Sequence, residues 1–250
     1  MKKKKIDFFI SEKILKKSIK HTNFCMAHSD VRHYLNGTLF EIKKNYIKST
    51  STDGYRVSTY KKNINTENLK ESIIIPRLTI NELFKILQDK SSLVKISIFE
   101  KKNICIKTND LTFTSKLVDG EFPSCKNLFV KEENRKKIII NKTEFQDALH
   151  RISILCNEQL NGISLFIDDK YIKITSQNQK DEFAEETIEI INPNNLKKTN
   201  ISINVNYILD VLKVIEGTAI RLIINQDLSN IQIKDCKDSS SKYLIMSLRI

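Results

Sequence analysis

Residues that could carry acid–base, nucleophilic or metal chemistry are scattered along this sequence. The histidines have no metal-like spacing with Cys, Asp or Glu; they are His21, His28, His33 and His150. The cysteines form no C-x-x-C pair, which argues against both a zinc site and a disulfide framework; they are Cys25, Cys105, Cys125, Cys156 and Cys236. We therefore expect core or incidental thiols, and no metal or other cofactor.

Acidic residues form two patterns that could suggest a catalytic site. Asp53 stands before Gly54 between β-rich segments, where Asp-Gly predicts a hairpin turn rather than an acid catalyst. Four glutamates alternate with apolar residues and predict a solvated strand or sheet edge with protective charge; they are Glu182, Glu185, Glu186 and Glu189. The sequence also lacks G-x-S-x-G, P-loop and G-x-G-x-x-G motifs, so we expect a protein that is not an enzyme.

One predicted helix, residues 12–22, separates apolar and basic side chains cleanly. At 100° per residue one arc is apolar, and the opposite arc holds four lysines: Lys13, Lys16, Lys17 and Lys20. These ammonium groups repel one another unless solvent screens them or a polyanion lies nearby, and both interpretations stay open. A similar helix predicted at residues 143–153 is far less basic.

The charge of the chain indicates a polyanionic partner. The 42 Lys and Arg exceed the 30 Asp and Glu, for a net charge of +12, and residues 181–250 contain 10 acidic and 8 basic side chains. The excess therefore lies in the first 180 residues, which favours nucleic acid; a coding bias toward Lys is the alternative. No helix-turn-helix, zinc-finger or RNP motif is present, so sequence-independent phosphate contacts are expected.

Composition narrows the class of protein further. The chain has 250 residues, 40% of them hydrophobic, and only 5 Gly and 3 Pro, which describes a globular chain of one large or two ordinary domains. No apolar run approaches the roughly 20 residues that span a bilayer. The first ten residues lack the apolar stretch of a signal peptide, so a cytoplasmic protein is expected.

An internal repeat predicts the architecture that positions these residues. LNG at 35–37 and 160–162, YIK at 46–48 and 171–173, and the helical segments 79–87 and 204–212 all match at a displacement of 125 residues. We therefore predict a duplicated α+β domain, each copy with two helices and antiparallel strands. The second helices are expected at 81–88 and 206–215, closing hairpins follow them at 94–107 and 220–234, and residues 131–137 are expected to link the copies.

Several segments together resemble a known family. They are STDGYRV at 51–57, IPR at 75–77, FTSKLVDGEFP at 113–123 and YLIMSLRI at 243–250. In this order the chain resembles the β sliding clamp, the beta subunit of bacterial DNA polymerase III. The resemblance implies tandem clamp-fold domains, each with two inner helices and outer antiparallel sheets. Residues 1–128 resemble the family's middle domain and residues 129–250 its C-terminal domain, and its N-terminal domain is absent.

The resemblance also implies a site for client proteins. Family members bind a short client peptide in an apolar cleft between the middle and last domains, which here would have two arginines at its rim. The matching positions are Leu35, Thr52, Gly54, Tyr55, Arg56, Val57, Pro123, Leu128, Leu244, Met246, Ser247, Leu248 and Arg249. This chain departs from the family at Tyr55, where His is usual, at Ser247, where Pro is usual, and at Asn127, where Arg is frequent.

Other positions match the surfaces that the family uses for DNA and for self-association. Arg32, His33, Tyr34 and Arg77 match DNA-touching positions, and Ile154 and Leu155 match the face that meets the partner subunit. The implied function is a processivity factor of the DNA polymerase III holoenzyme that slides on double-stranded DNA. The implied partners are the catalytic subunit, the clamp loader, other replication and repair clients, and further copies in a ring.

Two alternatives to this function stay open. A truncated clamp could keep the cleft and act only as a peptide-binding adaptor, unable to encircle DNA. A nucleic-acid enzyme is the other alternative, although no catalytic carboxylates support it. If the two-domain chain itself forms a ring, three copies would supply the six domains of a family ring.

Overall fold

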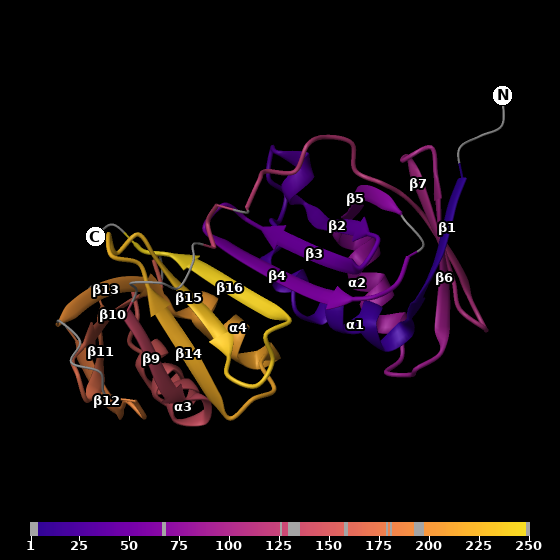
Figure 1. Cartoon of the computed structure of the whole chain (residues 1–250). Coiled ribbons are helices and arrows are strands. Elements are labelled where there is room, and N and C mark those ends of the chain that lie inside the picture. The colour runs from indigo at the N-terminus through magenta and orange to yellow at the C-terminus, as the bar shows by residue number, and fades with distance from the viewer. Residues whose placement is uncertain are drawn as a thin grey trace. The chain divides into compact units, whose positions relative to one another are not determined.

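The computed structural model describes residues 5–66, 69–125, 127–129, 136–157, 160–178, 180, 182–192 and 198–248. The chain divides into two compact units, Met1–Cys125 and Lys126–Ile250 (Figure 1). This division lies three residues before the boundary expected at residue 128. Both units have the same order of elements: a strand and a helix, four strands, a second helix and three strands.

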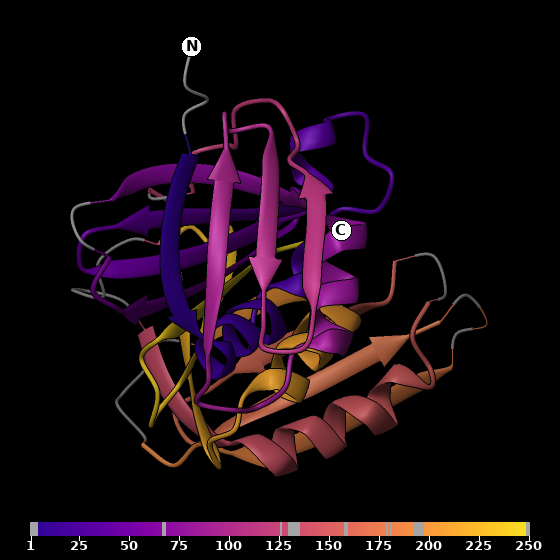
Figure 2. The same ribbon diagram turned by 90° about the vertical axis from the view of Figure 1, so that its right-hand side faces the viewer.

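The first unit contains two antiparallel sheets and two helices. Its elements are β1 (Lys5–Ser11), α1 (Glu12–Lys20), the 3-10 turns η1 (Asn23–Cys25) and η2 (His33–Leu35), β2 (Gly37–Lys43), β3 (Tyr46–Thr52), β4 (Arg56–Asn63), β5 (Lys70–Pro76), α2 (Arg77–Ile86), β6 (Leu93–Phe99), β7 (Asn103–Lys107) and β8 (Thr112–Lys116). One sheet has the order β1-β6-β7-β8 and is seen in Figure 2 with the helices behind it; the other runs β5-β2-β3-β4.

The core of the first unit explains why α1 forms where it does. Leu15 and Ile19 lie one turn apart on one face and are buried against strands of both sheets. Helix α1 contacts α2, β1, β3 and β4. The buried carboxylate of Glu12 accepts hydrogen bonds from Gln88 N at 2.6 Å and from Ser92 Oγ at 2.7 Å, which ties the start of α1 to the chain after α2.

The second unit repeats this plan. Its elements are β9 (Lys136–Asn141), α3 (Lys142–Ser153), β10 (Gly162–Ile167), β11 (Tyr171–Gln177), β12 (Phe183–Glu189), β13 (Thr199–Asn204), α4 (Val205–Val214), β14 (Ala219–Ile224), β15 (Asn230–Asp235) and β16 (Ser241–Met246). The two sheets have the orders β12-β11-β10-β13 and β16-β15-β14-β9. The side chains of Asn141 and Asn204 cap α3 and α4 by accepting backbone N–H groups, as Asn does at helix starts.

The duplicated α+β plan predicted from the repeat is confirmed, but one of its three alignments is wrong. Pro76 lies opposite Gly37 in the β2–β5 pair, and Asn204 lies opposite Gly162 in the β10–β13 pair. The second helices that follow are therefore related by 128 residues rather than 125. Helix α2 also begins at Arg77, four residues before the expected start, because the chain turns into the helix directly after Pro76 and needs no Asn cap.

Other expected elements agree closely with the structure. The closing hairpins form as β6–β7 and β14–β15, and the Glu-rich segment forms the end strand β12. Of the expected linker, residues 131–135 lie outside the described residues, and Lys136 and Lys137 already belong to β9. Among the described residues, no helix combines the length and apolar character needed to cross a membrane.

Candidate functional site

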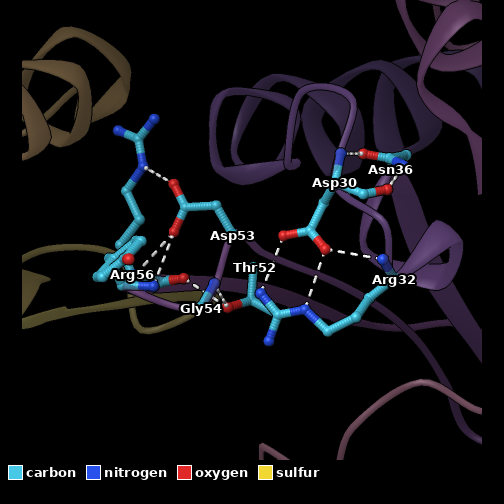
Figure 3. A network of polar contacts seen from close by, with 8 residues as sticks. Asp30, Arg32, Asn36, Thr52, Asp53, Gly54 and Arg56 are labelled. Carbon is cyan, nitrogen blue, oxygen red and sulfur yellow. Dashed lines mark hydrogen bonds and ion pairs between the residues drawn. The ribbon is translucent and has the colours of Figure 1, made fainter.

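The turn between β3 and β4 is closed by two of its own side chains (Figure 3). Thr52 Oγ1 accepts the N–H of Gly54 at 3.1 Å and donates to the carbonyl of Arg56 at 2.7 Å. Asp53 Oδ1 accepts the N–H groups of Tyr55 and Arg56, each at 3.0 Å. Gly54 has φ +95°, a left-handed conformation that favours glycine. The predicted Asp-Gly turn is confirmed, and the Asp53 carboxylate is committed to holding it.

Arg56 fastens this turn to the rest of the first unit. Its Nε donates to Asp53 Oδ2 at 2.9 Å, and an Nη donates to the carbonyl of Phe24 in η1 at 2.7 Å. The guanidinium also lies 5.6 Å from the centre of the Phe24 ring, within the range of a cation–π contact. The Arg56 side chain is only 11% exposed, whereas the neighbouring Tyr55 is 65% exposed. Arg56 therefore positions a turn that presents Tyr55 to solvent.

A loop carrying Arg32 lies against the same turn (Figure 3). The Arg32 Nε and Nη2 atoms donate to the two carboxylate oxygens of Asp30 at 3.0 and 2.9 Å, a bidentate pair. Asn36 holds the backbone of Asp30 from the other side, with hydrogen bonds of 2.9 and 2.8 Å. Arg32 lowers the pKa of Asp30 to about 2. A methyl group on Gly54 would lie 3.3 Å from an Arg32 Nη atom, so the loop and the turn are in contact.

Arg77, the first residue of α2, binds this loop from below the sheet edge. Its Nη1 donates to the carbonyls of Met26 at 2.8 Å and Ala27 at 3.3 Å, and its backbone N–H donates to the carbonyl of Asn36 at 2.8 Å. His33, in η2, is exposed, and the next residue, Tyr34, is half-buried. The four positions expected to touch DNA therefore belong to one loop and the helix start that holds it, and both arginines also brace that loop.

The four lysines expected to face DNA lie on α1, but they are not equally free. Lys13 is exposed and lies 4.0 Å from an Asp89 carboxylate oxygen. The Lys16 ammonium lies 5.8 Å from the centre of the Phe84 ring. Lys17 and Lys20 are half-buried. The basic face predicted for this helix is confirmed, with its charge partly engaged by neighbouring side chains.

Several expected cleft positions lie at the end of β16 in the second unit. Leu244 is buried opposite Gln232 of β15, and Met246 is partly exposed opposite Asn230. The backbone N–H groups of Ser247 and Leu248 continue the sheet by donating to carbonyls at 3.0 and 2.8 Å. Arg249 lies outside the described residues.

The remaining cleft positions differ in exposure. In the first unit Leu35 and Val57 are buried and Pro123 is exposed, while Leu128 in the second unit is exposed. Buried Leu35 and Val57 also support the core of the first unit, because their side chains are almost entirely removed from water.

The two residues expected at a subunit interface follow α3 in the second unit. Ile154 is 79% exposed, and the half-buried Leu155 accepts a hydrogen bond from Ser176 Oγ at 2.9 Å. Ser176 pairs with Ala184 on the end strand β12, beside which Phe183 lines a hollow of about 380 Å³. An exposed apolar residue, an open strand edge and a hollow thus share one flank of this unit.

The described part of the chain has no cluster of three or more His, Cys, Asp or Glu side chains that could hold a metal ion. The five cysteines are free, as expected, and Cys25, Cys125 and Cys156 are buried. Burial raises the pKa of the Cys125 and Cys156 thiols, which keeps them protonated at neutral pH.

Sequence reasoning missed several residues that shape these sites. Asp30 and Asn36 hold Arg32, and Phe24 receives Arg56. The spacing Asp30-x-Arg32 is a local signal that could have suggested the first pair. Asn230 Oδ1 and Gln232 Nε2 are buried without a hydrogen-bond partner in the described part of the chain, and no sequence signal marks them.

Two family models match almost the whole chain. The model described as DNA polymerase III beta subunit, central domain, matches residues 9–124, and the model of the C-terminal domain matches residues 127–249. The two matches correspond to the two units of the structure.

Individual relatives give the same result. The chain is 39% identical over 244 residues to the "Beta sliding clamp" of Buchnera aphidicola subsp. Rhopalosiphum padi and 32% identical over 245 residues to that of Escherichia coli K12. It aligns over 97–98% of its own length and spans 65–66% of the length of these relatives. The crystal structure of a DNA polymerase sliding clamp from Pseudomonas aeruginosa matches with a TM-score of 0.93 at 32% identity, covering 98% of this chain and 66% of that one. A Bacillus subtilis sliding clamp matches with a TM-score of 0.91 at 29% identity, covering 98% and 64%.

Proposed function

Because the chain belongs to the family of DNA polymerase III beta subunits, the β sliding clamps, we propose that it is a sliding clamp. In this role it is a non-catalytic processivity factor that tethers the replicative DNA polymerase III to duplex DNA. The observation that carries the proposal is the similarity of both units, over 98% of the chain, to clamps of known structure. The chain spans 66% of those relatives, so its own contacts with DNA and clients are the points to test.

The charge distribution supports contact with a DNA backbone. Residues 1–125 contain 24 Lys and Arg against 13 Asp and Glu, whereas residues 126–250 contain 18 against 17. In the first unit the lysines of α1 and the loop with Arg32, His33 and Tyr34 offer cations, a ring and backbone N–H groups for phosphates. A clamp must slide, so its contacts must be sequence-independent, and such contacts weaken steeply with salt.

A topological experiment tests this function. The protein is loaded onto nicked circular plasmid with a clamp loader, washed at moderate salt and then treated with a restriction enzyme that linearises the plasmid. A sliding clamp stays on the circle and leaves through the new ends, whereas a protein held by charge alone is lost from both forms as salt rises. Release that does not depend on linearisation would contradict the proposal.

We extend the proposal to the docking of client peptides. The turn that presents Tyr55 in the first unit and the end of β16 with Met246 in the second unit would each contact a short apolar client peptide. A flexible Met and exposed aromatic and aliphatic side chains suit ligands of varied sequence. Fluorescence titration with a labelled peptide from the carboxyl end of the polymerase catalytic subunit tests this. The double variant Met246→Ala, Leu248→Ala should lower affinity with most of the thermal stability retained, and unchanged affinity would remove the assignment.

A second candidate function is a peptide-binding adaptor that cannot encircle DNA. The exposed Ile154, at the position that matches the family's subunit interface, favours it, because an unpaired interface leaves apolar surface in water. The same plasmid experiment separates the two candidates. An adaptor binds the client peptide but shows no retention on the circle.

A further inference from the structure

We propose that a second copy of this chain docks on the open edge of β12, adding its own strand β8 to that sheet in a head-to-tail contact. The contact joins the second unit of one copy to the first unit of the next. It deepens the proposed function, since a ring requires such a contact, but it rests on three features of the described residues that are independent of DNA.

The first feature is an unprotected strand edge. Strand β12 pairs with β11 along its whole length, from Phe183 opposite Gln177 to Glu189 opposite Tyr171, and is the end strand of its sheet. Among the described strands none pairs with its other side. An extended end strand of seven residues presents a row of backbone donors and acceptors to which another strand can add.

The second feature is apolar surface on the same flank. Phe183 at the start of β12 is 58% exposed, and Ile154 after α3 is 79% exposed. Arg151 of α3 is joined to Glu186 of β12 by a two-bond ion pair of 2.6 and 3.0 Å, which keeps the end of the helix beside the strand. Aromatic and aliphatic side chains beside an open strand edge are typical of an association surface.

The third feature is charge, which selects the strand that fits. Strand β12 carries three glutamates and no basic residue, and Glu189 has no ion-pair partner among the described residues. Strand β8 is the end strand of the sheet β1-β6-β7-β8 and has Lys116 as its charged residue, with Lys107 on the adjacent strand. Neither lysine has an ion-pair partner within the described ranges.

The other end strands of the first unit fit less well. Strand β1 carries Lys5 and Asp7, and the Asp7 carboxylate already lies 3.1 Å from the Lys5 and Lys95 ammonium groups. Strand β5 carries Glu71 beside Lys70. Strand β8 therefore offers β12 the favourable charge with the least repulsion, and pairing β12 with a second β12 would bring glutamates together.

Charge exchange tests this contact. The mass of the 250-residue chain is measured by light scattering and sedimentation from 1 to 100 µM without DNA (about the range of weak to moderate interfaces). Three variants accompany it: Glu185→Lys with Glu189→Lys, Lys107→Glu with Lys116→Glu, and all four substitutions together. All four side chains are exposed, and circular dichroism checks that each variant folds.

The proposal expects self-association of the unchanged chain, dissociation constants raised at least about tenfold in each two-site variant, and recovery when all four charges are exchanged. A further pair of variants is matched for exposure: Phe183→Ser should weaken association, and Phe9→Ser, 57% exposed on the opposite end strand β1, should not. A chain that stays monomeric at 100 µM overturns the proposal, as does association that the charge exchange leaves unchanged or that the β12 exchange alone strengthens.

The outcome is separable from that of the clamp function. A chain that associates through β12 and β8 but is not retained on nicked plasmid contradicts the clamp proposal alone. A chain that is retained on the plasmid while the exchanged charges leave its mass unchanged contradicts only this contact.

Discussion

Replacing Arg56 with Met tests whether this side chain positions the turn that presents Tyr55. Met keeps part of the aliphatic bulk but removes the hydrogen bonds to the Asp53 carboxylate and the Phe24 carbonyl, at 2.9 and 2.7 Å. Hydrogen bonds to charged groups contribute about 1.5–3 kcal/mol each, and the cation–π contact roughly 0.5–1 kcal/mol.

The expected loss is smaller than the sum of these contributions. Asp53 keeps two backbone hydrogen bonds through its other oxygen, and both side chains are slightly exposed, so water relieves part of the cost. The carbonyl of Phe24 loses its guanidinium donor. We expect the free energy of unfolding of the first unit to fall by about 2–4 kcal/mol in Arg56→Met, and by roughly half as much in Arg56→Lys, which keeps the charge but not the fork geometry.

Urea titration followed by circular dichroism measures these losses. The matched control is Lys85→Met, which breaks an ion pair with Glu82 of 2.8 Å on the surface of α2, where the Lys85 side chain is 69% exposed. An exposed pair of this kind contributes about 0.5 kcal/mol or less. If Arg56→Met costs no more than Lys85→Met, the bridge from the turn to Phe24 does not stabilise the unit and the positioning role is wrong.

Three further predictions concern residues outside this bridge. Gly217→Ala would place a methyl carbon 2.2 Å from an Asp235 carboxylate oxygen that must then move away, so the thermal transition of the second unit should fall by the equivalent of about 1–3 kcal/mol; an unchanged transition contradicts the close approach. Arg32 holds the pKa of Asp30 at about 2, below the ordinary 3.8, so their pair stabilises the folded loop above that ordinary value and loses this effect as the pH falls toward 2. Carboxyl NMR should give a midpoint near 2 that Arg32→Ala returns toward 3.8, and a midpoint already near 3.8 in the unchanged chain would show that the pair is not formed. Glu12→Ala removes the acceptor of two hydrogen bonds from the chain after α2, and calorimetry should register a loss of about 2–4 kcal/mol, with Glu12→Gln intermediate; no difference between the two variants would count against a role for the charge.

Local signals in the sequence predicted the elements that carry the site. The 3.6-residue period of Ile10, Ile14, Leu15 and Ile19 was enough to place α1 and its lysine face, because burial of one helix face depends on residues a turn apart. Asp53-Gly54 was enough to place the β3–β4 turn, since its geometry is decided within four residues.

Signals that depend on insertions and caps were less dependable. The matching tripeptides at Gly37 and Gly162 give the displacement of 125, yet it becomes 128 at the second helices. Three extra residues in the second copy shift the helix without changing the strand pattern on either side. The start of α2 was misplaced for a related reason: Pro76 starts the helix without a side-chain cap, so the capping preference of Asn81 carried no information.

From the sequence alone came the duplicated α+β plan, the basic face of α1, the turn at Asp53 and the acidic end strand, all of which follow from neighbours within a few residues. Only the tertiary structure decided that Arg56 reaches the carbonyl of Phe24, 32 residues earlier, and that Arg32 packs over Gly54. A guanidinium can reach any carbonyl or carboxylate that packing brings near, and the sequence contains many of both. Which of them it meets is set by the sheet and helices that fold between them.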